Sequence, residues 1–311
     1  MSSYRDILNT FTLDTLPDLD VVTFAALELF SESTLPQVAY TKFNRPLVVG
    51  SGNAAVAGKL LFDDVDAVFA DESSYMQKLS VIDTIDGAFL ISASGGKHAI
   101  YIAQELVKRK IPTLLLTNNV AAPAQQILGA ASTFIFPKNR EPYTYNTSTY
   151  MGMLLSKTYE DERSIKIFIE TEVLKCVPQN FTSYTAIYLI IPEQFAQMRE
   201  MFQTKFDELF GPKLMARVFT LEQTKHAKTV IELPTELFVS FGVENNDFGL
   251  EKNRLFIPLP DDVDYAALMA VVYVFIGHIQ KQFPPYYKER IEAYTKETSA
   301  SFGSSITPIV E

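Results

Sequence analysis

One short stretch constrains the fold of this chain more than any other, residues 89–98, which read FLISASGGKH. An apolar, strand-like run leads into it, small hydroxyl residues and two glycines form its middle, and a helix-like run follows over residues 99–110. A strand that breaks into a Ser/Gly turn and then begins a helix presents unpaired backbone N–H groups at the positive end of the helix dipole. The stretch therefore predicts a strand–turn–helix unit that can hold an anion such as phosphate.

This turn contains the candidate phosphate ligands Ser92, Ser94, Gly95 and Lys97. The serine hydroxyls and the backbone N–H groups can donate to phosphate oxygens, and Lys97, expected in the first turn of the helix, adds a full positive charge. Ser and Gly are also common in ordinary loops between strands and helices, so a loop without a ligand is the alternative. The turn alone does not decide between the two, because short glycine motifs often match by chance.

A second turn of the same kind follows an apolar run at residues 46–50. It contains Gly50, Ser51, Gly52 and Asn53 and leads into a helix-like segment rich in small residues. Ligands of parallel α/β sheets bind at the carboxyl ends of the strands, where both turns are expected. The two turns are therefore predicted to face one ligand together.

Strand-like and helix-like segments alternate through most of the chain. Strands are expected near residues 45–50, 67–70, 87–92, 110–118 and 132–137, and again near 186–191, 236–242 and 254–258. Such alternation predicts an α/β fold with two tandem domains, each a parallel sheet flanked by helices in three layers. The expected parts are a helical lead (1–39), a first domain with both turns (40–157), a helical linker (158–183), a second domain (184–282) and a tail that can cover a cleft (283–311).

Composition excludes several classes of protein. The net charge of −10 argues against a general nucleic-acid or membrane-surface binder, which needs a basic face. A single cysteine, Cys176, rules out an internal disulfide framework. The first residues lack the pattern of a signal peptide, and the longest apolar run, residues 266–277, is shorter than a membrane-spanning helix. We expect a cytoplasmic protein with no nucleic-acid or membrane partner.

A hydroxyl-rich segment, Thr147, Ser148 and Thr149, opens a further predicted helix. Its hydroxyl and N–H groups would give a second set of donors for a phosphate group. Thr147 or Ser148 can equally serve only as a helix N-cap, which is the commoner use of such residues.

At this point several motifs together resemble one family. The segment 50–61 resembles the first loop and helix of phosphosugar isomerase (SIS) domains, especially those of the bifunctional phosphoglucose/phosphomannose isomerases. Ser92-Ala93-Ser94-Gly95 resembles the SxSG phosphate loop of that superfamily. Glu141 with 147–149 is similar to a segment in the isomerase half of glucosamine-6-phosphate synthase, and residues 222–226 resemble its Glu-x-Lys-His segment with one extra residue. The resemblance covers about residues 40–280 and is more specific in the first domain.

The resemblance implies a sugar-phosphate aldose–ketose isomerase, an intramolecular oxidoreductase that works through an enediol without metal or organic cofactor. In the family a Glu acts as base and a His helps to open the sugar ring, commonly in the site of the partner subunit. His226 matches this His, and Glu208 is the acidic residue nearest to the base position. A homodimer is implied by the shared His, and the apolar helix over residues 265–277 favours it too.

The chain departs from the family pattern at two places. Lys97 stands where a Thr commonly follows the phosphate loop, and the neighbours of Glu208 are not the usual Lys or Asn. Glu208 can instead lie on a solvated helix face, and His226, with Lys225 and Lys228, on a basic surface. The alternative functions are therefore a non-catalytic phosphosugar-binding or sensor protein and a relative of the deglycase type.

Overall fold

The computed structural model describes residues 3–227, 230–302 and 305–311. The chain forms two compact units. Residues 32–138 and 149–159 make the first, which we call the first-sheet unit, and residues 1–31, 139–148 and 160–311 make the second-sheet unit. The expected helical lead, helical linker and tail therefore belong, for the most part, with the second sheet.

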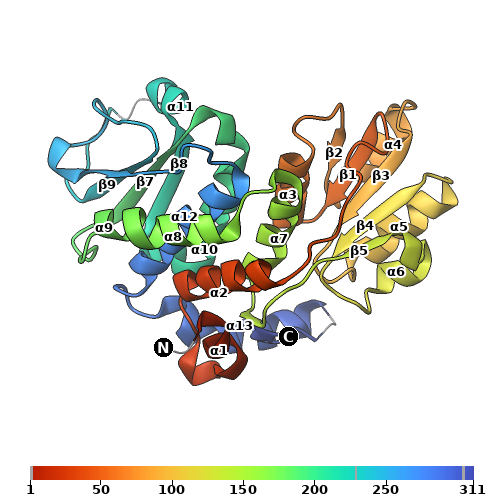
Figure 1. The fold of residues 1–311 in the computed structure, drawn as a ribbon, viewed down its shortest axis with the longest axis horizontal. Helices are drawn as coiled ribbons and strands as arrows, with labels where there is room; N and C mark the ends of the chain where they lie inside the picture. Colours follow the sequence, from red (N-terminus) through yellow and green to blue (C-terminus); the bar gives the residue numbers. More distant parts are fainter. Residues whose placement is uncertain (1–2, 228–229, 303–304) are drawn as a thin grey trace. The chain divides into compact units, whose positions relative to one another are not determined.

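The first-sheet unit contains a five-stranded parallel sheet (Figure 1). Its strands are β1 (Pro46–Gly50), β2 (Val68–Ala70), β3 (Gly87–Ile91), β4 (Thr113–Thr117) and β5 (Thr133–Ile135), in the spatial order β2-β1-β3-β4-β5. Every residue of β1, β3 and β4 is buried. Continuous apolar runs of this kind are typical of central parallel strands covered on both faces. The predicted parallel sheet is confirmed.

Helices flank this sheet. They are α3 (Asn53–Leu61), α4 (Tyr75–Val81), α5 (His98–Lys108), α6 (Pro123–Leu128), most of α7 (Thr147–Thr158) and the short η2 (Ala130–Ser132). Helix α5 buries its apolar stripe, Ile102 and Leu106 among it, in a cluster with Leu90 of β3. Helix α3 packs closely on β1 because Gly58 has no side chain: a Cβ there would lie 2.7 Å from Val48 Cγ1.

The second-sheet unit contains a four-stranded parallel sheet. Its strands are β7 (Ala186–Ile191), β8 (Met215–Thr220), β9 (Glu236–Phe241) and β10 (Arg254–Ile257), in the order β10-β9-β7-β8. Strand β8 pairs in parallel along its full length with β7. Between the strands lie η4 (Glu193–Met198), α10 (Arg199–Phe210), η5 (Gly211–Lys213), α11 (Leu221–His226) and η6 (Glu251–Asn253).

Helix α12 (Tyr265–Gln280) contains the long apolar run of the sequence. All of its residues except His278 are buried within a single chain. An apolar surface around the whole circumference is typical of a core helix. This burial removes the apolar helix as an argument for a second subunit.

The ends of the chain complete the second-sheet unit. At the N-terminus lie α1 (Tyr4–Thr10), η1 (Leu13–Thr15) and α2 (Leu19–Glu32), and before the second sheet lie α8 (Glu162–Phe168), the π-helical η3 (Ile169–Val173) and α9 (Leu174–Cys176). The expected tail is regular structure: α13 (Tyr286–Phe302) and β11 (Ile309–Val310), which pairs antiparallel with β6 (Glu141–Pro142). Among the described residues, the helices are too short or too polar to span a lipid bilayer.

Candidate functional site

The turn after β3 is held by its own hydroxyl groups. Ser92 Oγ accepts the N–H of Gly95 at 3.1 Å, and Ser94 Oγ accepts the N–H of Gly96 at 3.2 Å. The amide of Asn119 donates to the carbonyl of Ser94 at 2.9 Å. A hydroxyl that accepts a hydrogen bond keeps its own O–H as a donor, so both serines retain a proton to donate to an anion.

Two residues of this turn adopt positive φ angles, Gly95 at +63° and Lys97 at +45°. At Gly95 only glycine fits, because a Cβ would lie 2.5 Å from Ala122 Cβ. Lys97 is the N-cap of α5 and not part of its first turn as expected, and His98 is the first helical residue. The side chains of both Lys97 and His98 are exposed. The exposed ammonium group at the head of α5 suits an anion that arrives from solvent.

The turn after β1 is built in a similar way. A Cβ at Gly50 would lie 2.7 Å from the backbone carbonyl carbon of Ala54, so the start of α3 approaches the strand end closely. Gly52 has a φ of +54°, and Ser51 and Asn53 complete the turn. Strands β1 and β3 are neighbours, and Gly50 pairs with Ile91 at their carboxyl ends. The structure thus brings the two predicted turns to the same edge of the first sheet.

The donors at the start of α7 are already engaged. The carboxylate of Glu141 accepts the N–H groups of Thr147 and Ser148, each at 2.7 Å, and also the hydroxyl of Ser148. Burial raises the pKa of Glu141, while these hydrogen bonds oppose the rise. Glu141 therefore acts as the anion at this helix start, a role that was not predicted from the sequence. A phosphate-binding role of Thr147, Ser148 and Thr149 stays a prediction.

The side chain of Glu208 lies near the end of α10 beside a buried lysine. The Nζ atom of Lys205 donates to Glu208 Oε2 at 2.7 Å and to the carbonyls of Thr144 and Tyr145 at 3.0 Å each. Lys205 has no exposed side-chain surface, and Glu208 exposes 22%. Three acceptors around one ammonium group use all of its N–H donors. Lys205 is therefore a fixed positive charge next to the candidate base.

The pKa of Glu208 is raised overall, although two effects oppose each other. Burial raises its pKa, and the ammonium of Lys205 lowers it through charge attraction and a hydrogen bond. The lysine stabilises the ionised carboxylate that a general base needs. Lys205 was not among the residues predicted from the sequence, although its i, i+3 spacing to Glu208 on a helix was a usable signal.

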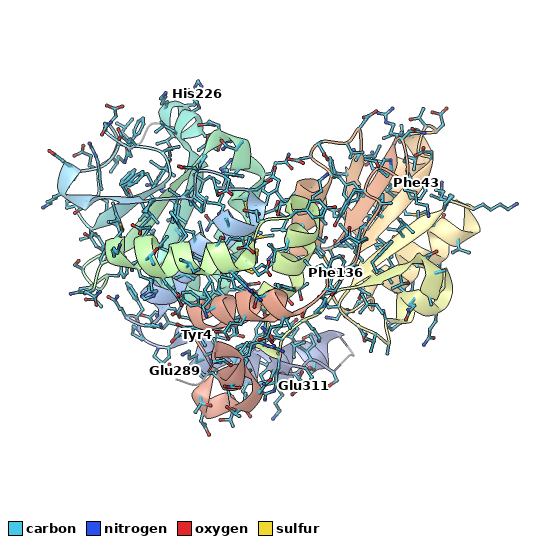
Figure 2. The ribbon with its side chains drawn as sticks, in the orientation of Figure 1. Tyr4, Phe43, Phe136, His226, Glu289 and Glu311 are labelled. Carbon is cyan, nitrogen blue, oxygen red and sulfur yellow. The ribbon has the colours of Figure 1, made fainter. Side chains whose placement is uncertain are left out.

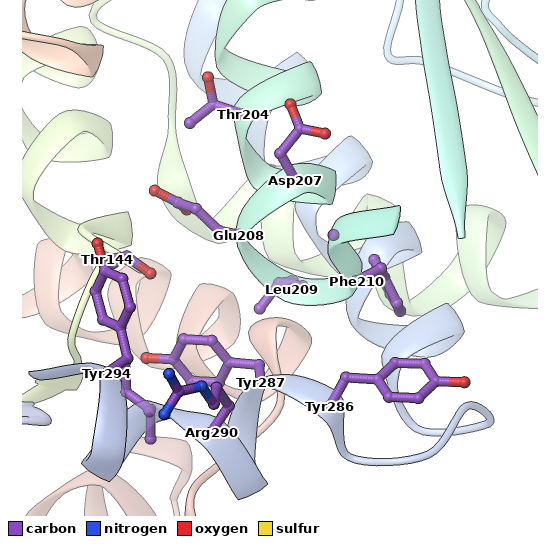
Figure 3. A pocket seen from close by; sticks show the side chains of 12 residues that line it. Thr144, Thr204, Asp207, Glu208, Leu209, Phe210, Tyr286, Tyr287, Arg290 and Tyr294 are labelled. Carbon is purple, nitrogen blue, oxygen red and sulfur yellow. The ribbon is translucent and has the colours of Figure 1, made fainter. Parts of the chain in front are cut away.

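Glu208 opens into a pocket of about 490 Å³ within the second-sheet unit (Figure 3). Its lining comes from the end of α10, from α13 and from the loop after β6: Thr144, Thr204, Asp207, Glu208, Leu209, Phe210, Gly211, Tyr286, Tyr287, Arg290, Ile291 and Tyr294. A concave, mostly apolar site with a few polar groups and a carboxyl of shifted pKa is the usual form of a small-molecule site. The expected tail, as α13, forms one wall of this pocket.

His226 is placed differently. It is the last residue of α11, and its side chain is exposed at the surface (Figure 2). Helix α10 leads into β8 and α11 follows it, so Glu208 and His226 lie beyond opposite ends of this strand. Six residues at roughly 3.3 Å each separate these ends by about 20 Å. The two residues of one chain therefore do not meet at one sugar.

The surroundings of His226 are mixed in charge. Lys225 pairs with Glu222 on the same helix, so one of the two expected basic neighbours is already neutralised. Lys228, the other, lies outside the described residues.

His278 lies 3.8 Å from Asp20 in α2, and burial lowers the pKa of this histidine. Among the described residues, no group of three His, Cys, Asp or Glu side chains is arranged to hold a metal ion.

Comparison with known proteins places the fold. No protein-family model and no curated protein matches the sequence. The C-terminal domain of glucosamine-fructose-6-phosphate aminotransferase from Francisella tularensis superposes with a TM-score of 0.61 at 12% identity, over 88% of this chain and 98% of that chain. Tagatose-6-phosphate ketose/aldose isomerase from Escherichia coli gives 0.56 at 12% identity over 92% of both chains. Glucosamine-6-phosphate deaminase from Thermotoga maritima gives 0.55 at 13% identity over 84% of this chain and 92% of that chain. The SIS-type fold expected from the resemblance is confirmed.

Proposed function

We propose that this chain, which shares its fold with structures of a tagatose-6-phosphate ketose/aldose isomerase and a glucosamine-6-phosphate deaminase, is itself a sugar-phosphate aldose–ketose isomerase. The single observation that carries the proposal is the Lys205–Glu208 pair at the wall of a ligand-sized pocket. Isomerisation moves a proton between C1 and C2 through an enediol. A carboxylate that is partly shielded from water and paired with an ammonium group is suited to that transfer.

The two turns of the first sheet supply the second part of the proposal. Ser51, Ser92 and Ser94 with the glycines beside them offer donors at one sheet edge, and Lys97 adds charge. In the proposed enzyme they bind the phosphate of the substrate.

His226 is assigned to ring opening in the site of a partner subunit. Within one chain it lies beyond the end of β8 opposite to Glu208, and the strand itself is about 20 Å long. In a symmetric dimer each subunit gives its His to the other, so that two complete sites form. The proposed enzyme is accordingly a homodimer that uses no metal or organic cofactor.

Coupled assays on fructose 6-phosphate, glucose 6-phosphate and mannose 6-phosphate test this function. We expect turnover of at least one pair of these sugars, and we expect Glu208→Gln to lower kcat at least about 100-fold, the low end for a lost general base. Glu200→Gln is the matched control, because Glu200 lies on the same helix with an exposed side chain. No turnover of any of the three by the correctly folded protein would contradict the proposal.

The exposure of His226 favours one other function, a phosphosugar-binding or sensor protein without catalysis. In that case the protein binds the phosphate group, but His226 does not reach the Glu208 of a partner subunit. Thermal stabilisation by fructose 6-phosphate, equal in wild type and Glu208→Gln and without turnover, would support this function over the isomerase.

A further inference from the structure

Three large apolar side chains are exposed within four residues shortly after α11. Val230 exposes 93% of its surface, Ile231 79% and Leu233 45%. Single apolar side chains are common on protein surfaces, but a group of large ones marks a contact with another molecule. Residues 230–233, which we call the apolar segment, also contain the exposed carboxylate of Glu232. The apolar segment is therefore a candidate surface for a partner.

The pocket beside Glu208 has an aromatic wall. Tyr286, Tyr287 and Tyr294 of α13 face the pocket (Figure 3). Tyr287 is buried, but Tyr286 is half-buried and Tyr294 exposes 43% of its surface, so this wall continues to the mouth of the pocket. Tyrosines are enriched where two proteins meet, and they contribute most when they are covered. We call these three residues the tyrosine wall.

Charged groups lie at the two ends of the tyrosine wall. In Figure 3 Asp207 and Glu208 of α10 lie at one end, and Arg290 of α13 lies at the other. The guanidinium of Arg290 holds Glu297 through hydrogen bonds of 3.1 and 2.6 Å. Both side chains are more than half exposed, and such ion pairs contribute little. Arg290 can therefore exchange Glu297 for a carboxylate of a partner, which a guanidinium binds in the same bidentate manner.

The chain around the apolar segment has the complementary order of charges. His226, which becomes a cation when protonated, ends α11, Val230 and Ile231 follow, and Glu232 comes next. A basic group, an apolar pair and an acid thus follow one another along the chain. Across the pocket the order is acidic, apolar and basic. Such complementarity sets the alignment of two surfaces and disfavours other alignments.

A single chain does not make this contact. Figure 2 shows His226 and Glu289, a residue of α13, on opposite sides of the second-sheet unit. A second copy in antiparallel orientation brings each apolar segment to the pocket of the other copy. A two-fold axis then repeats the contact, so the assembly closes as a dimer.

We infer that residues 230–233 dock on the tyrosine wall of a second copy of this chain. Glu232 then pairs with Arg290 of the partner subunit, and the end of the pocket at Glu208 stays open to the sugar. The inference rests on the proposed function, because the proposed transfer of His226 to the partner's site brings the end of α11 to the same pocket. It adds the surface that holds the two subunits together.

Sedimentation equilibrium of the full chain measures the affinity of the dimer. We expect Ile231→Asp to weaken dimerisation at least about 100-fold, because the contact occurs twice and each lost isoleucine side chain costs at least about tenfold. Val81→Asp is the matched control, since Val81 is also exposed, at 71%, but lies on α4 of the other unit. Its affinity should equal that of the wild type. Unchanged dimerisation of Ile231→Asp, or a wild type that stays monomeric, would overturn the inference.

An exchange of charges tests the alignment of the two surfaces. Glu232→Arg and Arg290→Glu should each weaken dimerisation at least about tenfold, because each places like charges together twice. The double variant brings opposite charges together again, and its affinity should return to within about threefold of the wild type. A double variant that dimerises no better than the single variants would overturn the pairing of Glu232 with Arg290.

Turnover of fructose 6-phosphate, measured on the same samples, separates the inference from the proposed function. If the wild type turns over the sugar and Ile231→Asp dimerises as tightly as the wild type, the inference is wrong and the proposed isomerase stands. If Ile231→Asp and the charge exchange act as expected but no sugar phosphate is turned over, the inference stands and the proposed isomerase fails.

Discussion

Lys205 and Glu208 lie one helical turn apart on α10, with Nζ of the lysine 2.7 Å from Oε2 of the glutamate. The lysine reaches this position because its other two donors are held by the carbonyls of Thr144 and Tyr145, in the loop that follows β6. Strand β6 in turn pairs with β11 near the end of the chain. The charge state of the candidate base therefore depends on a loop and a strand distant in sequence.

Replacement of this lysine tests its electrostatic role. We expect Lys205→Met to shift the acidic limb of the pH profile of kcat/KM to higher pH, because burial raises the pKa of Glu208 and the opposing charge is lost. The free energy of unfolding should fall by about 2–4 kcal/mol, as when one partner of a buried ion pair is removed. Lys205→Arg keeps the charge and should restore part of the profile. An unshifted acidic limb in an active Lys205→Met enzyme would contradict the role given to Lys205.

The conformation of the phosphate turn gives a second prediction. Gly95→Ala should lower the free energy of unfolding by about 1–3 kcal/mol, because the residue has a positive φ and its new Cβ meets Ala122. Gly96→Ala is the matched control, since a Cβ there lies 3.5 Å from the nearest atom, Ser94 Oγ. Urea denaturation measures both. Equal stability of the two variants would show that the turn does not need glycine at position 95.

Lys97 combines an unfavourable backbone conformation with a useful charge. Its φ of +45° is favoured by glycine, so Lys97→Gly should be more stable than Lys97→Ala by about 1 kcal/mol. Both variants lose the ammonium group and should weaken fructose 6-phosphate binding by a similar factor. Chemical denaturation and calorimetry on the same samples check the two effects separately. If both variants bind as tightly as wild type, Lys97 does not contact the phosphate.

The separation of Glu208 and His226 along β8 leads to a complementation experiment. Glu208→Gln and His226→Ala homodimers should each be inactive. After the subunits are mixed and allowed to exchange, about a quarter of wild-type activity should return, because half of the dimers are mixed and each has one intact site of two. Mixing without any return of activity, although mixed dimers are present, would show that the two residues do not share a site between subunits.

Local patterns in the chain were enough to predict much of the fold. The apolar runs of β1, β3 and β4 are buried on both faces, and the small residues of α3 let it approach the sheet, as their side chains alone suggested. The two Ser/Gly turns meet at one sheet edge because β1 and β3 are adjacent. That adjacency follows from strand order, which is a property of the whole sheet and is not visible in either turn.

Contacts between segments that are far apart in the sequence were harder to predict. The sequence shows that hydroxyl residues 147 and 148 follow Glu141 closely. It does not show that the carboxylate of Glu141 accepts the N–H groups of these two residues. The length of α12 indicates a helix, but only its burial shows that a single chain covers it. In both cases the deciding contact joins segments whose spacing in the sequence carries no signal.

The amino-acid sequence by itself determined the α/β class, the parallel strands and the positions of the two turns, because hydrophobic periodicity and glycine conformation act over a few neighbouring residues. The tertiary structure alone decided that Lys205 is buried against two carbonyls and Glu208, that α13 walls a pocket with tyrosines, and that His226 lies beyond the far end of β8. The physical reason is that burial and charge pairing depend on which segments pack together, and packing is a property of the whole folded unit.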